Sequence, residues 1–159
     1  MGSRSKIDLA YIAGFLDGDG SLMLQIKKRK DGRLKRRFMA TICFYQDGRH
    51  ETPLGWIREK LGIGYLSRRN DGMSELRING FRQVRNILEN LLPYIRFKEK
   101  QARALLAALH LLLKTEGSRL DEKNTRLLAE HILAIQDGNY VTKRKKTREE
   151  LFAILGLTP

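Results

Sequence analysis

Two aspartates that are each followed by a glycine, Asp17 and Asp19, end a stretch that is apolar or small from Leu9 onwards. Glycines at the end of a helix place its last carboxylates at a terminus, beside backbone carbonyl oxygens. Hard divalent cations bind carboxylate and carbonyl oxygens together. A turn at the end of a helix also favours Asp and Gly, but two carboxylates at the negative end of a helix dipole call for compensation. A bound cation would supply it.

A second chemical signal is a run of positive charge that begins one short segment later. Residues 27–37 contain eight Lys or Arg against one acid, Asp31. A charge run is often only a solvated surface, but here it extends a predicted β-hairpin whose outward positions are also polar. A two-stranded ribbon fits the DNA major groove, where polar side chains read base edges and cations neutralise phosphates. The candidate DNA contacts are Gln25, Lys27, Arg29, Arg33, Arg37, Thr41, Tyr45, Ser67, Arg69, Glu75 and Arg77.

The balance of charge in the whole chain agrees with a polyanionic partner. Lys and Arg number 31 against 18 Asp and Glu, which gives a net charge of +13 over 159 residues. Such an excess favours nucleic acid over a membrane surface. We expect no membrane partner, because no apolar run approaches the 18 or so residues that a span needs. Cys43 is the only cysteine, so an internal disulfide is excluded and an intracellular location is expected.

Small residues recur along the stretch that precedes the two aspartates. Ala10, Ala13, Gly14 and Asp17 are spaced to lie on one helix face. Small residues on one face permit very close approach of a second helix. We therefore expect a partner helix here, contributed by this chain or by a second copy of it.

The elements that must position these residues follow from hydrophobic periodicity. Helices are predicted over residues 7–18, with Asp8 as N-cap, over 52–61, with Thr52 as cap, and over 81–91, 98–114 and 122–135. Alternation predicts strands over residues 20–29, 36–46, 63–69 and 73–79. A basic run at 143–148 precedes a last short helix. The pattern predicts an α+β fold with the order αββαββα, in which helices cover one face of a four-stranded antiparallel sheet. We expect a single domain over residues 1–159, with a core at about 7–114 and a C-terminal helical extension at about 115–159.

The segment from Ile12 to Gly20, which reads Ile-Ala-Gly-Phe-Leu-Asp-Gly-Asp-Gly, resembles the signature of the LAGLIDADG homing endonucleases. The Gly62-Ile63-Gly64-Tyr65 segment and the Pro-x-x-x-x-Lys-x-Lys-Gln stretch that begins at Pro93 resemble the single-motif members of that family. The resemblance covers roughly residues 7 to 114. It implies a saddle-shaped sheet that binds DNA.

The resemblance also implies roles for individual residues. Asp19 matches the metal-binding catalytic carboxylate, and Gly18 matches the residue whose carbonyl meets the metal. Gln46 matches a residue that positions water, and Lys98 matches the basic residue near the scissile phosphate. The family's arginine after the second strand falls on Arg49 or His50. Asp17 matches the less directly catalytic acid, and Cys43, Glu75 and Arg77 fall at positions that contact bases.

The activity implied is cleavage of both strands of a long, nearly palindromic DNA site by a homodimer. The cofactor implied is Mg²⁺ or Mn²⁺, with Ca²⁺ expected to bind without supporting cleavage. The setting would be the cytoplasm of a prokaryote or an organelle. Two alternatives stay open, an RNA splicing maturase and a non-cleaving DNA-binding regulator of the same fold, and RNA is the less favoured partner.

Overall fold

The computed structural model describes residues 4–31, 36–115, 120–139 and 144–158. The predicted Arg33 contact and Lys143 of the basic run lie outside the described residues. Helix and strand bounds are α1 Lys6–Asp19, β1 Gly20–Lys28, β2 Arg36–Asp47, α2 Thr52–Leu61, β3 Tyr65–Arg68, β4 Met73–Asn79, α3 Phe81–Leu91, α4 Glu99–Lys114, α5 Glu122–Gly138 and α6 Arg148–Leu155. Short 3-10 turns cover Gly48–His50 and Leu92–Tyr94.

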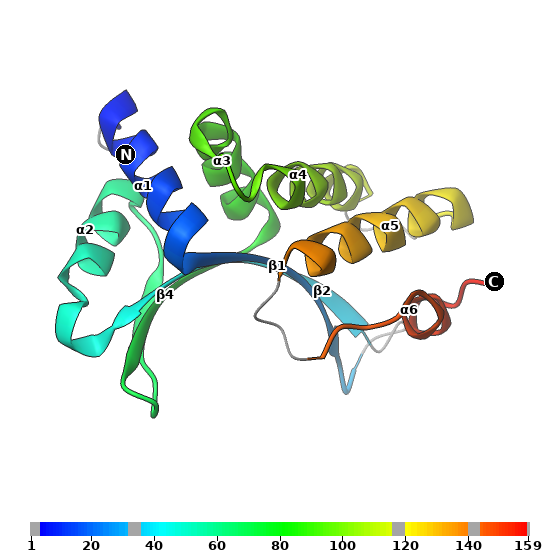
Figure 1. Cartoon of the computed structure of the whole chain (residues 1–159). Helices are drawn as coiled ribbons and strands as arrows, with labels where there is room; N and C mark the ends of the chain where they lie inside the picture. Colours follow the sequence, from blue (N-terminus) through cyan, green and yellow to red (C-terminus); the bar gives the residue numbers. More distant parts are fainter. Residues whose placement is uncertain (1–3, 32–35, 116–119, 140–143, 159) are drawn as a thin grey trace.

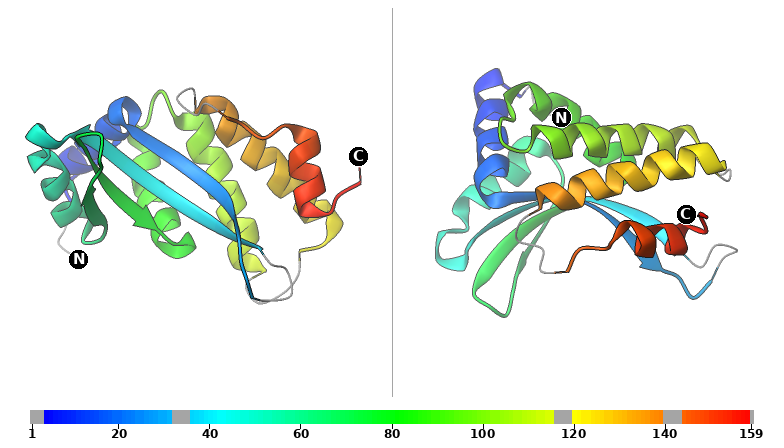
Figure 2. Two further views of the ribbon diagram at one scale, coloured as in Figure 1. Left: turned by 90° about the horizontal axis from the view of Figure 1, so that it is seen from below. Right: turned by 45° about the vertical axis from the view of Figure 1, so that its right-hand side comes forward.

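The four strands form one antiparallel sheet in the order β1-β2-β4-β3. Helices α1, α3, α4 and α5 lie on one side of this sheet, which arches beneath them (Figure 1). The opposite face of β1, β2 and β4 is turned toward the viewer, with the helices behind it, when the molecule is seen from below (Figure 2). The predicted α+β class, element order and antiparallel sheet are confirmed.

Strand alternation separates the core from the polar face, as the sequence predicts. Leu22, Ile42, Phe44 and Leu76, all at even positions, are fully buried beneath the helices. The β1–β2 register places Leu22 opposite Ile42 and Gly20 opposite Phe44, so the apolar residues of both strands share one face. No helix among the described ranges is long and apolar enough to cross a membrane.

Two of the predicted caps are wrong by one turn or less. The Ser5 hydroxyl, rather than Asp8, caps α1 by accepting the Asp8 backbone N–H at 3.0 Å. Asp8 instead pairs with Lys60 of α2 at 3.2 Å. Thr52 is the first residue of α2, and Glu51 occupies the cap position. Helix ends are the least certain part of a sequence-based assignment, because several polar residues compete for one terminus.

The exposed face of α1 also differs from the predicted one. Ala13 is fully buried and Asp17 is 9% exposed, so both face this chain's own interior. Ala10 and Gly14 do lie on the exposed side, and the side chains that flank them are Ile7 and Tyr11, which are 81% and 52% exposed. The helix is apolar almost all round, so periodicity alone could not tell which face points outward.

Candidate active site

Asp17 fixes the end of α1 to the segment that leads into α4. One carboxylate oxygen accepts the Arg96 backbone N–H at 2.7 Å, and the other accepts the Lys98 backbone N–H at 3.0 Å. The Asp17 backbone carbonyl accepts a hydrogen bond from Lys98 Nζ at 2.6 Å. The first signature acid is therefore a structural clamp between two elements. This explains why it is buried rather than presented to a ligand.

Lys98 is held in an environment that is unusual for a lysine. It is only 7% exposed, and it stands immediately before α4. Burial disfavours the charged ammonium and lowers the Lys98 pKa below its ordinary value, while the carboxylates of Asp17 and Asp19 act in the opposite direction. The result is a buried cation close to the second signature acid.

Asp19 contrasts with both of these residues because it is exposed at the last position of α1. It lines a hollow of about 340 Å³ together with Gly18 and Lys98. The hollow is also lined by residues of the polar sheet face and of the C-terminal extension: Ser21, Met23, Tyr45, Arg69, Met73, Gly138 and Asn139. A carboxylate and an ammonium therefore converge where α1 joins β1.

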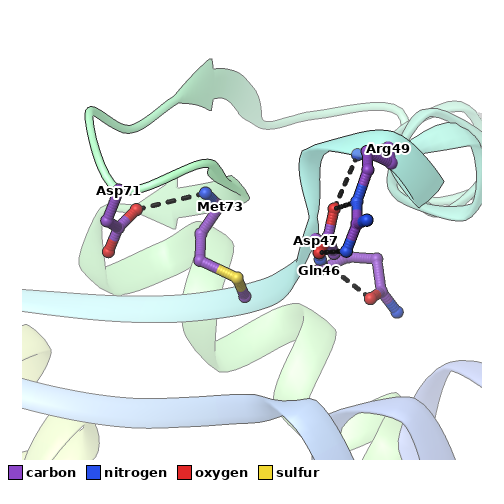
Figure 3. Close-up of polar contacts among 5 residues, drawn as sticks. All are labelled: Gln46, Asp47, Arg49, Asp71 and Met73. Carbon is purple, nitrogen blue, oxygen red and sulfur yellow. Dashed lines mark hydrogen bonds and ion pairs between the residues drawn. The ribbon is translucent and has the colours of Figure 1, made fainter.

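The other three predicted catalytic residues lie at the end of β2 and do not line this hollow. The Gln46 side-chain oxygen accepts the Asp47 backbone N–H at 2.8 Å. Arg49 forms a two-point ion pair with Asp47, at 3.0 Å from Nε and 2.8 Å from the terminal nitrogen (Figure 3). This pair lowers the Asp47 pKa and raises the Arg49 pKa. The Arg49 charge is thus already balanced by Asp47 within the chain. His50 is exposed.

The turn that follows β2 meets the β3–β4 turn beside this group. The Gly48 backbone N–H donates to the Gly72 carbonyl at 2.8 Å, and a Cβ on Gly48 would overlap that carbonyl. Asp71 accepts the Met73 backbone N–H at 3.1 Å and so shapes the β3–β4 turn (Figure 3). Glycine at position 48 therefore permits the close approach of the two turns that carry Arg49 and Met73.

Two predicted DNA contacts form the floor of the polar sheet face rather than its surface. Thr41 and Cys43 are both fully buried. The Thr41 hydroxyl donates to the Asn79 side-chain oxygen at 2.7 Å, and burial raises the pKa of the Cys43 thiol. We therefore remove both from the proposed contact surface. Alternation predicted the face on which they lie but could not reveal that they are buried.

The charged residues among the remaining predicted DNA contacts are paired differently on the two hairpins. On the β3–β4 hairpin, Arg69 pairs with Asp71 at 2.8 Å and Arg77 pairs with Glu75 at 3.1 Å. On the β1–β2 hairpin, Arg29 lies 3.8 Å from Asp31. Within the described part of the chain, no carboxylate lies within ion-pair distance of Lys27, Lys28, Arg36 or Arg37. Gln25, Tyr45 and Ser67 are half-buried.

Six lining residues were not among the predicted site residues: Gly20, Ser21, Met23, Met73, Gly138 and Asn139. Ser21 carries a usable signal, since it alternates with Leu22 and follows Asp19 closely, and its hydroxyl lies 3.1 Å from the Tyr45 hydroxyl. Gly138 and Asn139 carry none, because they are about 120 residues from Asp19 in sequence. Only the packing of α5 brings them to the hollow.

Comparisons of the sequence with known proteins find a matching family and relatives over nearly the full length. The LAGLIDADG endonuclease family model matches residues 12–109. The DNA endonuclease I-CvuI from Chlorella vulgaris is 32% identical over 153 residues, which cover 96% of this chain and 94% of that protein. The DNA endonuclease I-CreI from Chlamydomonas reinhardtii is 29% identical over 151 residues, covering 95% and 90%.

Solved structures extend the likeness to three dimensions. A crystal structure of the homing endonuclease I-CvuI in complex with its target, in the presence of Ca, has a TM-score of 0.76 at 30% identity and covers 97% of this chain and 98% of that one. The I-SmaMI LAGLIDADG homing endonuclease bound to cleaved DNA shares the fold, with a TM-score of 0.73 at 19% identity. The match covers 98% of this chain but only 50% of the I-SmaMI chain. With the signature segment, the fold and a full-length relative above 30% identity in agreement, this chain belongs to the LAGLIDADG endonuclease family.

Proposed function

We propose that two copies of this chain assemble into a site-specific endonuclease that cuts both strands of a long, nearly palindromic DNA site with the help of Mg²⁺. As a family member matched along its length by two DNA endonucleases, the chain is a DNA endonuclease. The observation that carries the fuller proposal is the hollow shared by Asp19 and Lys98. It is lined in part by Ser21 and Tyr45 of the polar sheet face, so a phosphate in it would belong to a duplex lying on that face.

The donor set fits a divalent ion that keeps much of its water. Asp19 is an exposed carboxylate next to Gly18, and no group of three or more metal-ligating side chains occurs among the described residues. Mg²⁺ is commonly held by one or two carboxylates together with substrate phosphates. One carboxylate from each of two copies would meet that need. When bound, such an ion activates water and polarises the phosphate.

The chain's own residues contribute binding and charge. The Asp19 carboxylate would hold the ion, and the exposed α1 terminus leaves room for a phosphate beside it. The Lys98 ammonium, fixed by the Asp17 carbonyl at 2.6 Å, would neutralise charge on that phosphate as it develops. Gln46 and His50 lie at the end of β2 and do not line the hollow that holds Asp19. We therefore assign them water positioning rather than metal binding.

The homodimer is supported by the outward face of α1. A Cβ added to Gly14 would meet no other side chain or element of the described chain within 4 Å, so internal packing does not require glycine there. Glycine inside a helix costs about 1 kcal/mol relative to alanine. Ile7 and Tyr11 on the same side are largely exposed apolar residues. A second α1 packed against this face would bury Ile7 and Tyr11. It could approach closely because Gly14 has no side chain.

The length comparison supports the same assembly. This chain corresponds to half of the I-SmaMI chain but to almost the whole of I-CvuI. One fold unit per chain implies that a second chain completes the enzyme. Two-fold symmetry of the protein then calls for a nearly palindromic target. We place the enzyme in a compartment that holds DNA, the cytoplasm of a prokaryote or an organelle.

The test is cleavage of a supercoiled plasmid that carries the DNA flanking this reading frame, fused at the point of insertion. Wild-type protein should linearise the plasmid with Mg²⁺ and leave it intact without a divalent ion. Asp19→Asn should cut about 1,000-fold more slowly or worse, because a metal ion's charge stabilisation is worth several kcal/mol. Its affinity for the same site in Ca²⁺ should stay close to that of the wild type.

The matched control is Glu59→Gln, the same type of change at an exposed position of α2, which should cut normally. If the wild type binds the site tightly but does not cleave it in Mg²⁺ or Mn²⁺, the protein is a DNA-binding regulator and not an endonuclease. Cleavage by Asp19→Asn at the wild-type rate would remove Asp19 from the catalytic assignment.

A further inference from the structure

The C-terminal end of α5 reaches the active-site hollow although it lies outside the family match over residues 12–109. Gly138 and Asn139 line that hollow. Gly138 also lines a second hollow of about 350 Å³, together with Asp17, Gly18, Phe97, Lys98 and Gln101. Figure 2 shows the C-terminal end of α5 beside the start of β1, where the chain leaves α1. The C-terminal extension is therefore part of the site's wall.

Asn139 joins the two elements that directly follow the catalytic groups in the chain. Its side-chain nitrogen donates to the Leu22 carbonyl of β1 at 3.0 Å. Its side-chain oxygen accepts from Gln101 of α4 at 3.2 Å. β1 begins at Gly20, directly after Asp19, and Gln101 lies one helical turn beyond Lys98. One amide side chain thus ties the strand that follows Asp19 to the helix that follows Lys98.

The groups that Asn139 bonds to both need a hydrogen-bond partner. Gln101 is only 4% exposed, and a buried amide without a partner carries a substantial desolvation cost. β1 is the edge strand of the sheet, so the Leu22 carbonyl needs a partner from outside the sheet if it points to the open edge. Asn139 can satisfy both needs at once because an amide side chain has both a donor and an acceptor end.

Gly138 makes room for the bridge. A Cβ built on Gly138 would overlap the side-chain amide of Gln101. Its backbone is not in the left-handed region that favours glycine, so the requirement at this position is space. A methyl group there would push the Gln101 amide away from Asn139 without changing either of the two bonded residues.

We propose that Asn139 is a positioning residue of the endonuclease, which sets the separation of Asp19 and Lys98 by bonding β1 and α4 together. The inference rests on the proposed function. Neither Asn139 nor Gln101 needs to touch DNA or metal for it to hold. Misplacement of reacting groups by about 1 Å can cost about 100-fold in rate, so a latch between these two elements acts directly on the chemical step.

The first test is Asn139→Ala, measured by single-turnover cleavage of a bound target in Mg²⁺ and by affinity for that target in Ca²⁺. We expect the cleavage rate to fall about 10-fold or more, with the dissociation constant changed by less than about twofold. The control is Asn90→Ala, because Asn90 is an exposed amide whose side chain bonds to its own helix, at the Asn86 carbonyl. It should change neither quantity.

The second test uses the space at Gly138 and the partner at Gln101. Gly138→Ala should reproduce the loss of rate, and it keeps the test decisive if Asn139→Ala does not fold. The double variant Gln101→Ala, Asn139→Ala should be no slower than the worse single variant, because both changes break one bridge. Additive losses would contradict a shared latch. A lowered Tm with an unchanged cleavage rate well below that Tm would reduce Asn139 to a purely structural residue.

Amide hydrogen exchange on metal-free protein separates this inference from the proposed function. Asn139→Ala should speed exchange in residues 20–23 and 98–102 while leaving α2 unchanged. If the wild type proves not to cut DNA, the proposed function fails, and exchange still decides whether the latch exists. Unchanged exchange in both segments would overturn the latch whether or not the wild type cuts.

Discussion

Asp19 and Lys98 line one hollow but lie in different surroundings. Asp19 is exposed, whereas Lys98 is 7% exposed and bonded to a backbone carbonyl. Burial lowers the Lys98 pKa, and the two nearby carboxylates offset only part of that effect. A lysine with a lowered pKa loses its charge at a lower pH than an exposed lysine does. Any step that needs this charge should therefore weaken on the alkaline side.

Substitution of Lys98 should reveal that dependence. Lys98→Ala should slow single-turnover cleavage about 100-fold or more while leaving affinity in Ca²⁺ largely intact, because a charge positioned on the transition state is worth about 3 kcal/mol. Lys98→Arg keeps its charge at all working pH values, so its rate should decline at a higher pH than that of the wild type. The measurement is the pH profile of the cleavage rate for each variant.

The opposite profile would assign Lys98 another role. If the wild-type rate rises through the alkaline range and Lys98→Arg is inactive at every pH, the neutral amine is the working form and Lys98 acts as a base. Lys100→Ala is the matched control, since Lys100 is an exposed lysine two residues away. It should leave the shape of the profile unchanged.

Residue types predicted the site only in part. The place of Asp19 at the end of an apolar helix predicts a carboxylate beside free carbonyl groups, and the family resemblance implies the roles of Asp19 and Gly18. Asp17 has the same type and the same following glycine, yet its carboxylate is used by the Arg96 and Lys98 backbone. Local sequence could not separate the two aspartates, because the difference is made by a segment about 80 residues away.

At the scale of elements, the two hairpins carry their cations differently. Arg69 and Arg77 of the β3–β4 hairpin are held by carboxylates, which fixes the direction of each guanidinium. Lys27 and Arg37 of the β1–β2 hairpin have no such partner among the described residues. Fixed guanidinium groups suit base recognition, and unpaired cations suit phosphates. We therefore propose that one part of the sheet face reads bases and the other binds the DNA backbone.

Salt dependence of binding checks this division. Lys27→Ala and Arg37→Ala should each reduce the slope of log affinity against log salt by about 0.9, because each removes one phosphate contact and its released counterion. Arg77→Ala should leave the slope nearly unchanged and relax the preference at one or two base pairs, by about 1–3 kcal/mol each. Binding is measured in Ca²⁺ against a series of single-base-pair target variants.

Equal slopes for all three variants would contradict the division. Arg85→Ala supplies the baseline, because Arg85 lies on α3, on the helical side of the sheet, and its guanidinium bonds to the neighbouring Asn86. A change in slope for that variant would place DNA on the helices instead of on the polar sheet face.

For the whole molecule, the deciding feature is the outward face of α1. Ile7, Tyr11 and Gly14 share that face, and nothing in the described part of this chain covers Ile7. Next to it, Tyr11 meets Trp56 of α2 edge to face, with ring centroids 5.3 Å apart. The same helix thus joins the core through Ile12 and Leu16 and leaves an exposed apolar surface, which we propose a second copy covers.

Gly14→Leu should separate the copies without unfolding them. Gly14 is exposed and an added Cβ meets no neighbour within 4 Å in the single chain, but a leucine would stand between two closely packed helices. We expect sedimentation to show a monomer at concentrations where the wild type is a dimer, with plasmid cleavage lost and the far-UV circular dichroism unchanged. Gly14→Ala should give a weaker defect in assembly, although alanine favours the helix by about 1 kcal/mol.

Gly55→Leu provides the matched control for this prediction. Gly55 is likewise an exposed helical glycine at which an added Cβ would have open space among the described residues, but it lies in α2. That variant should remain a dimer and cut DNA. An intact, active Gly14→Leu dimer would show that the copies meet elsewhere.

The sequence by itself determined the order of helices and strands, the core face of the sheet and the carboxylate at the end of α1. These features depend on periodicity and on residue type, which act over a few neighbouring positions. The tertiary structure alone decided which face of α1 points outward, which aspartate is exposed, and that Thr41 and Cys43 are covered. It also brought Asn139 to the site across a separation of about 120 residues. Each of these depends on contacts between distant segments, and local patterns carry no record of which segments will meet.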